Sequence, residues 1–188
     1  GLGASDLPCI AVDDGSTDTS AEVLAAWREE LPEQRWLIRH DSNRGKAAAL
    51  QSGFELAMEL GYTHALTIDT DGQHDPDDIP ALLRESEREP CIMVIGSRDS
   101  RTPGYPLRSR VGRRVSSALV WLASGQLVDD SQSGMRVYPL SLLARIRPRA
   151  DWSSRYGFET EVLTRLGFHG IGCIERPIRC IYEPRGVA

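Results

Sequence analysis

Short apolar runs alternate with longer amphipathic segments along the whole chain. The runs at 9–12, 36–39, 65–68, 92–95 and 174–182 predict strands, and the segments at 20–30, 46–60, 76–87, 109–124, 140–146 and 159–166 predict helices. This alternation is typical of an α/β protein with a mostly parallel sheet flanked by helices. With 188 residues, the chain is long enough for one sizeable core, so we expect a single domain spanning 1–188.

In open α/β sheets, ligands bind beyond the carboxyl ends of the strands, so the residues that follow each predicted strand are the candidate site residues. In the stretch VDDGSTD, Asp13 and Asp14 follow the first strand, and Gly15 permits a tight turn. Ser16 or Thr17 is predicted to cap the next helix. We expect the two adjacent acids to point into a site and accept hydrogen bonds from a base or a ribose, the alternative being a turn or cap role.

The second strand end of interest is the stretch DSNRGKAAAL. It contains the only Asn and the only Lys of the chain, Asn43 and Lys46. A glycine followed by a lysine at a helix N-terminus can bind a phosphate through backbone N–H groups and a point charge. The same NRG sequence is also typical of an ordinary turn.

The third strand end is the acidic stretch DTDGQHDPDD. Asp69 and Asp71 can project in the same direction, and two converging carboxylates repel each other unless a cation joins them. Mg²⁺ or Mn²⁺ suits oxygen ligands and shares them with a diphosphate, and Gln73 is a candidate third ligand. An EF-hand is excluded because its glycine would fall at His74 and its closing glutamate at Pro80.

The remaining acids of this stretch have a structural explanation. Asp75 is predicted to cap a helix that starts at Pro76, with Asp77 and Asp78 placed favourably on the helix dipole. A response-regulator receiver and a phosphatase with an aspartate nucleophile use a similar arrangement of acids. Both normally need a lysine on a later strand end, and no lysine follows Lys46, so neither class is favoured.

Composition narrows the function further. The net charge of −5 argues against nucleic-acid binding. The four cysteines have no metal-ligand spacing and lie in or beside apolar runs, which predicts buried free thiols and a reducing compartment. No apolar run approaches the roughly 18 residues that span a bilayer, and no signal-peptide pattern opens the chain. We therefore expect a soluble protein in the cytoplasm.

Six stretches in this order and at these distances resemble the GT-A glycosyltransferases of family 2. They are VDDGSTD, NRGKAAAL, DTDGQHDPDDI, IGSR, DSQSGMRVYP and YGFETEVL. The similarity is greatest to the branch that includes dolichyl-phosphate mannose and undecaprenyl-phosphate sugar synthases, and it covers residues 9 to about 185. It implies a GT-A fold, Rossmann-like, with a mostly parallel sheet.

The resemblance also implies residue roles. Asp13 and Asp14 would hold the nucleoside, and Lys46 would lie near the nucleotide. Asp69, Asp71 and Gln73 would bind Mg²⁺ or Mn²⁺ and the diphosphate of a UDP- or GDP-sugar, as the DXD motif of the family does. The residues expected on the acceptor side are Asp130 as the candidate base and Arg98, Ser133 and Arg136 as phosphate contacts.

The implied reaction is an inverting transfer, in which an acceptor oxygen attacks the anomeric carbon and the metal stabilises the departing nucleoside diphosphate. A lipid-phosphate acceptor is already anionic and needs no strong base, whereas a hydroxyl acceptor would require Asp130 to take a proton. A solvated loop acid is the alternative reading of Asp130. Glu159 and Glu161 fit the family pattern, but they also suit a helix start.

The segment LRSRVGRRVSSALVWLAS bears on whether the protein contacts a membrane. Val111, Val115, Leu119 and Leu122 fall at helical spacing behind a cluster of arginines. Such a helix can rest on anionic lipid at the cytoplasmic face of a membrane and guide a polyprenyl phosphate of the cell envelope to the site. The alternative is a helix whose apolar face packs on the core.

Family members begin with a strand and a helix before the VDDGS strand, and here only GLGASDLP precedes it. We therefore expect the first strand and helix to be missing, with truncation also at the C-terminus, and a homo-oligomer or strand swap is one way to replace the strand. Two alternatives to a glycosyltransferase stay open. One is a degenerate nucleotide-sugar-binding domain without turnover, and the other is a nucleotidyltransferase of similar fold.

Overall fold

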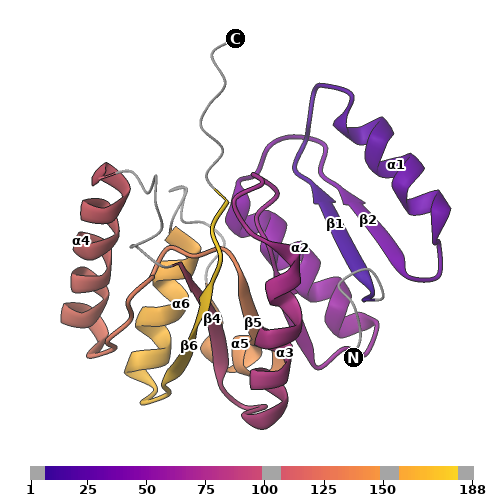
Figure 1. Ribbon diagram of the computed structural model, residues 1–188. Helices are drawn as coiled ribbons and strands as arrows, with labels where there is room; N and C mark the ends of the chain where they lie inside the picture. Colours follow the sequence, from indigo (N-terminus) through magenta and orange to yellow (C-terminus); the bar gives the residue numbers. More distant parts are fainter. Residues whose placement is uncertain (1–6, 99–106, 149–156, 182–188) are drawn as a thin grey trace. The chain divides into compact units, whose positions relative to one another are not determined.

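The computed structural model describes residues 7–98, 107–148 and 157–181 (Figure 1). The chain divides into two compact units. The first comprises Gly1–Thr63 with Arg149–Phe158, and the second comprises His64–Pro148 with Glu159–Ala188. The single domain expected from the chain length stays a prediction.

The first unit is a β-α-β-α arrangement. Its elements are β1 (Cys9–Asp13), α1 (Ser20–Glu30), β2 (Arg35–Arg39) and α2 (Lys46–Glu59). The strands are parallel, with Cys9 opposite Arg35 and Asp13 opposite Arg39. Helix α1 packs on both strands and α2 packs on β1 (Figure 1). Because the strands run in the same direction, the loops that follow Asp13 and Arg39 emerge at the same edge.

The second unit contains a four-stranded sheet in the order β3-β5-β4-β6. Its elements in chain order are β3 (His64–Thr67), the 3₁₀ turn η2 (Pro76–Asp78), α3 (Ile79–Arg88), β4 (Met93–Arg98), α4 (Leu107–Ser124), β5 (Arg136–Pro139), α5 (Leu140–Ile146), α6 (Gly157–Phe168) and β6 (Cys173–Ile178). The first two residues of α6 fall in the first unit. Strand β4 is parallel to β6, whereas β5 is antiparallel to both β3 and β4.

The predicted α/β class is confirmed, and every predicted strand and helix is present. Strand β5 was not predicted, because RVYP is only four residues long and begins with an arginine and ends with a proline. All four of its residues are nevertheless buried. The last strand is shorter than the predicted 174–182, since it ends at Ile178.

The core of the second unit lies around β4 and β5. Its fully buried apolar side chains include Leu82 of α3, Met93, Val94 and Ile95 of β4, Val120 of α4, Val137 of β5, and Leu163 and Leu166 of α6. The four cysteines are free, as predicted. The prediction that they are buried holds for Cys180, whereas Cys173 is half-buried and Cys9 and Cys91 are exposed. Cys9 is the first residue of β1 and Cys91 lies in the turn before β4, where neither strand is yet covered.

Candidate functional site

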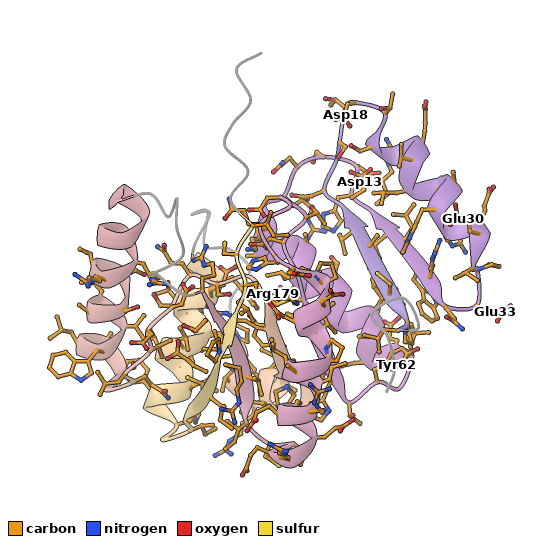
Figure 2. All side chains as sticks on the ribbon, in the orientation of Figure 1. Asp13, Asp18, Glu30, Glu33, Tyr62 and Arg179 are labelled. Carbon is orange, nitrogen blue, oxygen red and sulfur yellow. The ribbon has the colours of Figure 1, made fainter. Side chains whose placement is uncertain are left out.

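Two clusters of site residues emerge, one in each unit. In the first unit, Asp13 is buried at the carboxyl end of β1 (Figure 2). One carboxylate oxygen accepts a hydrogen bond from the backbone N–H of Ser16 at 2.9 Å. Hydrogen bonding from the side chain of Ser16, and then from its backbone N–H, lowers the pKa of Asp13. The other oxygen lies 3.4 Å from Nε of Arg39. Asp13 is therefore an anion fixed at the strand end.

Asp14 joins the loop after β1 to the loop after β2. Its carboxylate accepts the backbone N–H groups of Arg44 at 2.9 Å and Gly45 at 2.7 Å, and it lies 2.7 Å from Nδ1 of His40. Nε2 of the same buried imidazole lies 2.9 Å from Oγ of Ser52. Burial pushes the pKa of Asp14 upward, but the bonds from His40, Arg44 and Gly45 outweigh it and hold that pKa below its usual value.

This carboxylate fixes the start of α2. Gly45, at φ +90°, precedes Lys46, the first residue of the helix. Gly15, at φ +74°, brings the first loop so close that a Cβ there would lie 2.5 Å from the backbone of Ser42. Asp14 and Gly15 together therefore set where Lys46 and the N-terminus of α2 are placed.

The predicted cap of α1 is wrong. Neither Ser16 nor Thr17 caps the helix. The backbone N–H of Ser20 instead donates to the side chain of Asp18 at 3.0 Å (Figure 2). The reason is that α1 begins at Ser20 with Thr19 in the N-cap position, so Ser16 and Thr17 lie too far before its first turn.

The second cluster begins with the acidic loop after β3. Asp71 accepts a hydrogen bond from the backbone N–H of Gln73 at 3.0 Å, which closes a tight turn. The carboxylate of Asp69 lies directly against Gly134, where any side chain would overlap it. Thr67 fixes this approach, because its hydroxyl donates to the carbonyl of Gly134 at 2.9 Å.

The donor set of this loop fits a hard divalent cation that is shared with a substrate. Within 7–98, 107–148 and 157–181, no group of three or more His, Cys, Asp or Glu side chains forms a protein-only metal site. Mg²⁺ is usually bound through one or two carboxylates, with phosphates and waters completing its shell. Two carboxylates beside an amide oxygen match that pattern better than they match a protein-only cage.

The predicted cap at Asp75 is confirmed, since its side chain accepts from the N–H of Asp77 at 3.0 Å. A segment from the far end of the chain holds the same loop in place. Arg179, just past β6, lies 3.1 Å from Asp75 and 3.2 Å from Asp78 (Figure 2). The N–H of Ile181 donates to the carbonyl of Gln73 at 3.0 Å.

Asp130 is the centre of a buried charge network. It is fully buried, and Nε and Nη2 on one edge of the Arg98 guanidinium donate to its two carboxylate oxygens at 2.7 and 2.9 Å. Arg113 lies 3.5 Å away and also donates to the backbone carbonyl of Arg98 at 2.6 Å. Burial pushes the pKa of Asp130 upward, but its bonds to Arg98 and the charges of both arginines hold the pKa below its usual value.

Sequence reasoning did not single out two residues of this network, Arg113 and Glu175. The carboxylate of Glu175 accepts the backbone N–H groups of Asp129 at 2.8 Å and Asp130 at 3.0 Å. Arg113 is one of several arginines at the start of its helix, and nothing in the sequence distinguishes it from the others. Asp130 therefore lies in a loop that Glu175 holds in place, and its burial disfavours the alternative of a solvated loop acid.

Arg136 and Ser133 lie inside the protein. Both are fully buried. The guanidinium of Arg136 donates to the carbonyls of Ser131, Ser133 and Glu159 at 2.7, 2.8 and 3.3 Å. These bonds shape the loop that carries Asp130 and Gly134, and they turn the guanidinium toward the protein instead of toward a phosphate.

His74 was not predicted as a functional residue. It is 6% exposed, and among the residues that the structure describes no group hydrogen-bonds its Nδ1 atom. Burial lowers its pKa, with Asp69 acting to raise it, Arg98 to lower it, and Asp71 and Asp130 to raise it. The imidazole is therefore within electrostatic reach of both the acidic loop and the Arg98–Asp130 pair.

The two acids near the start of α6 are buried, which a simple dipole role at a helix end does not require. Glu161 forms an ion pair with Arg165 one turn later at 2.7 Å. The backbone carbonyl of Glu159 accepts from Arg136, so this acid belongs to the frame of the Asp130 loop.

Helix α4 carries its apolar stripe on the outside. Val115, Leu119 and Leu122 are 54, 59 and 72% exposed, and Trp121 is half exposed, whereas Val120 is buried. The alternative of a stripe packed on the core is therefore wrong for these residues. In the described part of the chain, no helix combines the length and apolar character that crossing a membrane requires.

The sequence is similar to glycosyltransferases that use lipid phosphates by name. The family model described as Glycosyl transferase family 2 matches residues 3–147. The UDP-N-acetylglucosamine–dolichyl-phosphate N-acetylglucosaminyltransferase of Methanococcus voltae is 31% identical over 193 residues, covering 95% of this chain and 76% of that protein. The undecaprenyl-phosphate mannosyltransferase of Micrococcus luteus is 30% identical over 182 residues, covering 94% and 73%.

Among solved structures, the fold is similar to glucosyl-3-phosphoglycerate synthase from Mycobacterium tuberculosis in complex with Mn²⁺, UDP-glucose and glycerol 3-phosphate. The TM-score is 0.61 at 21% identity, and the match covers 93% of this chain. This chain spans 61% of the length of that one. The likeness confirms the predicted GT-A fold.

Proposed function

Because this chain belongs to glycosyl transferase family 2, we propose that it transfers a sugar from a UDP- or GDP-sugar to a polyprenyl phosphate. The observation that carries the proposal is the acidic loop after β3. It presents Asp69 and Asp71 at a strand end, with Asp69 packed on Gly134 and Asp71 fixed by its turn to Gln73. The relatives named above act on lipid phosphates, which supports the same acceptor class here.

Asp69, Asp71 and Gln73 would hold Mg²⁺ or Mn²⁺ together with the donor diphosphate. When bound, the cation neutralises charge on the departing nucleoside diphosphate. The turn from Asp71 to Gln73 and the packing of Asp69 on Gly134 orient the two carboxylates before any ligand arrives. Such preorganisation lowers the cost of binding two anionic phosphates at one point.

In the first unit, Asp13 and Lys46 are proposed to contact the nucleotide. Asp13 supplies a fixed carboxylate for a base or ribose hydrogen bond, and Lys46 supplies a positive charge at a helix N-terminus. The carboxylate of Asp14 already serves Arg44, Gly45 and His40. Its proposed contribution is to hold the Lys46 loop in its binding shape.

The environment of Asp130 favours a phosphate acceptor over a hydroxyl. A general base must take up a proton, and two neighbouring arginines oppose that on Asp130. A lipid phosphate is already an anion and attacks the anomeric carbon without losing a proton. We assign Asp130 the role of holding Arg98 in place. Arg98 is then the candidate contact to the acceptor phosphate, while Ser133 and Arg136 shape the loop behind it.

The exposed stripe of α4 is proposed to rest on the membrane that contains the acceptor lipid. Val115, Leu119 and Leu122 form one face, and the exposed Arg114 adds positive charge beside it. Amphipathic helices with basic residues bind anionic bilayers through apolar burial and charge attraction. This contact would keep the catalytic residues close to a lipid phosphate at the bilayer surface.

A transfer assay tests the proposal. The protein is incubated with Mn²⁺, undecaprenyl phosphate in detergent, and UDP-N-acetylglucosamine or GDP-mannose, and the glycolipid is measured by mass spectrometry. We expect metal-dependent product with at least one donor, loss of product in Asp71→Asn, and retention in Asp77→Asn, whose exposed acid lies on the same stretch. Nucleotide binding without product from any donor would instead support a degenerate binding domain.

A further inference from the structure

The proposed function leaves the placement of the buried imidazole of His74, beside the acidic loop, unexplained. It is 6% exposed, and its Nδ1 atom has no hydrogen-bond partner within the described residues. Buried polar atoms nearly always find a partner, because leaving one unpaired is costly. An unpaired imidazole nitrogen at a substrate site therefore indicates a partner that arrives with the substrate.

The backbone on both sides of His74 is fixed. His74 forms an antiparallel bridge with Cys180, and Ile181 donates to the carbonyl of Gln73 at 3.0 Å. The ion pairs of Arg179 with Asp75 and Asp78 hold the pairing segment to the next turn. The backbone of His74 is thus held in place by the segment that follows β6.

The charged groups that act on His74 belong to the proposed donor and acceptor sites. The carboxylates of Asp69 and Asp71 act on the imidazole electrostatically, and so does the Arg98–Asp130 pair. Nδ1 carries a hydrogen in one tautomer of the neutral imidazole and in the imidazolium, and it then donates one hydrogen bond. In a site built for a diphosphate and a lipid phosphate, the acceptor that both substrates bring is an anionic phosphate oxygen.

We propose that Nδ1 of His74 donates a hydrogen bond to a phosphate oxygen of a bound substrate, either the donor diphosphate or the acceptor phosphate. The inference rests on the proposed function, because it takes its ligand from the same site. It makes His74 a direct substrate contact that is distinct from the carboxylates that hold the cation.

The geometry of amide side chains gives a sharp test. The amide nitrogen of asparagine can reach the position of Nδ1, whereas that of glutamine reaches the position of Nε2. We expect His74→Gln and His74→Leu to weaken the contact about ten- to a hundredfold, the range for a hydrogen bond to a charged group, and His74→Asn to retain most of it. A role in packing alone would favour His74→Leu or His74→Gln over the shorter asparagine.

Two measurements distinguish the sources of the phosphate. Calorimetric titration of UDP and GDP with Mn²⁺ reports the donor diphosphate, and the KM for undecaprenyl phosphate at saturating donor reports the acceptor. A loss in Gln and Leu variants that is restored in Asn, in either measurement, supports the proposal and identifies the source. Thermal unfolding midpoints of the three variants control for misfolding.

Equal behaviour of all three variants and the wild type in both measurements would overturn the role of His74 while leaving the proposed function intact. Tighter nucleotide binding or a lower KM in His74→Leu than in His74→Asn would also overturn it, because that order indicates a role in packing. If the wild-type protein binds neither nucleotide and makes no product, the proposed function itself fails and this inference falls with it.

Discussion

Gly134 and Asp69 lie in direct contact, although 65 positions separate them in the sequence. A Cβ on Gly134 would overlap the carboxylate of Asp69. The contact exists because β5 pairs with β3, with Arg136 opposite Thr67, and the residues that adjoin this pair meet at the sheet edge. The glycine before β5 thus sets the position of the first carboxylate of the acidic loop.

Replacing Gly134 with alanine should displace the carboxylate of Asp69. We expect Gly134→Ala to weaken Mn²⁺-dependent binding of UDP or GDP by roughly 10–100-fold, as loss of a group that orients a metal ligand commonly does. Calorimetric titration measures this effect. The matched control is Gly172→Ala, where a Cβ meets nothing within 4 Å. Equal binding by both variants would show that the position of Asp69 is unimportant.

Asp14 is predicted to matter for the stability of the first unit. In Asp14→Ala, the N–H groups of Arg44 and Gly45 and the imidazole of His40 lose their acceptor. We expect a loss of about 1–3 kcal/mol in the free energy of unfolding, together with weaker nucleotide binding through Lys46. Urea unfolding measures the first effect. Asp41→Ala, at an exposed neighbouring acid, should change neither property.

The ion pairs of Asp130 predict a pH-dependent contribution to stability. Because the pKa of Asp130 is lowered in the folded protein, its contribution is present above the unfolded-state value of about 3.9 and is lost as pH falls through the folded value. At pH 7, Asp130→Asn should cost about 3–5 kcal/mol, since it leaves the buried Arg113 and the half-buried Arg98 without their anion.

Urea unfolding of the wild type and Asp130→Asn at pH 7 and at pH 3 checks this prediction. The difference between the two proteins should be smaller at the lower pH, where protonation weakens the same ion pairs in the wild type. A difference that is independent of pH would mean that Asp130 acts through hydrogen bonds or packing instead of through its charge.

The exposed stripe of α4 is predicted to bind lipid. Replacing both Leu119 and Leu122 with serine should reduce co-flotation with vesicles that contain phosphatidylglycerol, because it removes apolar surface of 59 and 72% exposed side chains. Val23→Ser, at a 63% exposed valine of α1, is the control. If the double variant floats with vesicles as well as the control does, α4 is not the lipid-binding surface.

Local sequence patterns were sufficient to locate most of the fold. The helices 20–30 and 140–146 were predicted to the residue, and the cap at Asp75 followed from local chemistry alone. These features depend on neighbouring residues only. Strand β5 escaped prediction because its stability comes from pairing with β3 and β4 on both sides, which a four-residue pattern does not reveal.

For the candidate site, too, local features could be predicted from the sequence and tertiary features could not. The acidic pairs could be found because acids after an apolar run are conspicuous in a sequence. The surroundings of Asp130 could not, since Arg98, Arg113 and Glu175 come from three separate elements. The contact of Gly134 with Asp69 and the burial of His74 are likewise tertiary features. Neither could be predicted from neighbouring residues in the sequence.

The most direct test of the central claim is calorimetric titration of UDP and GDP into the wild-type protein and Asp71→Ala, with and without Mn²⁺. We predict binding of at least one nucleotide that requires Mn²⁺ and that Asp71→Ala abolishes. Binding that is unaffected by Mn²⁺ and by the substitution would contradict a metal-bridged diphosphate at the acidic loop. The absence of binding by the wild type would contradict the donor site as a whole.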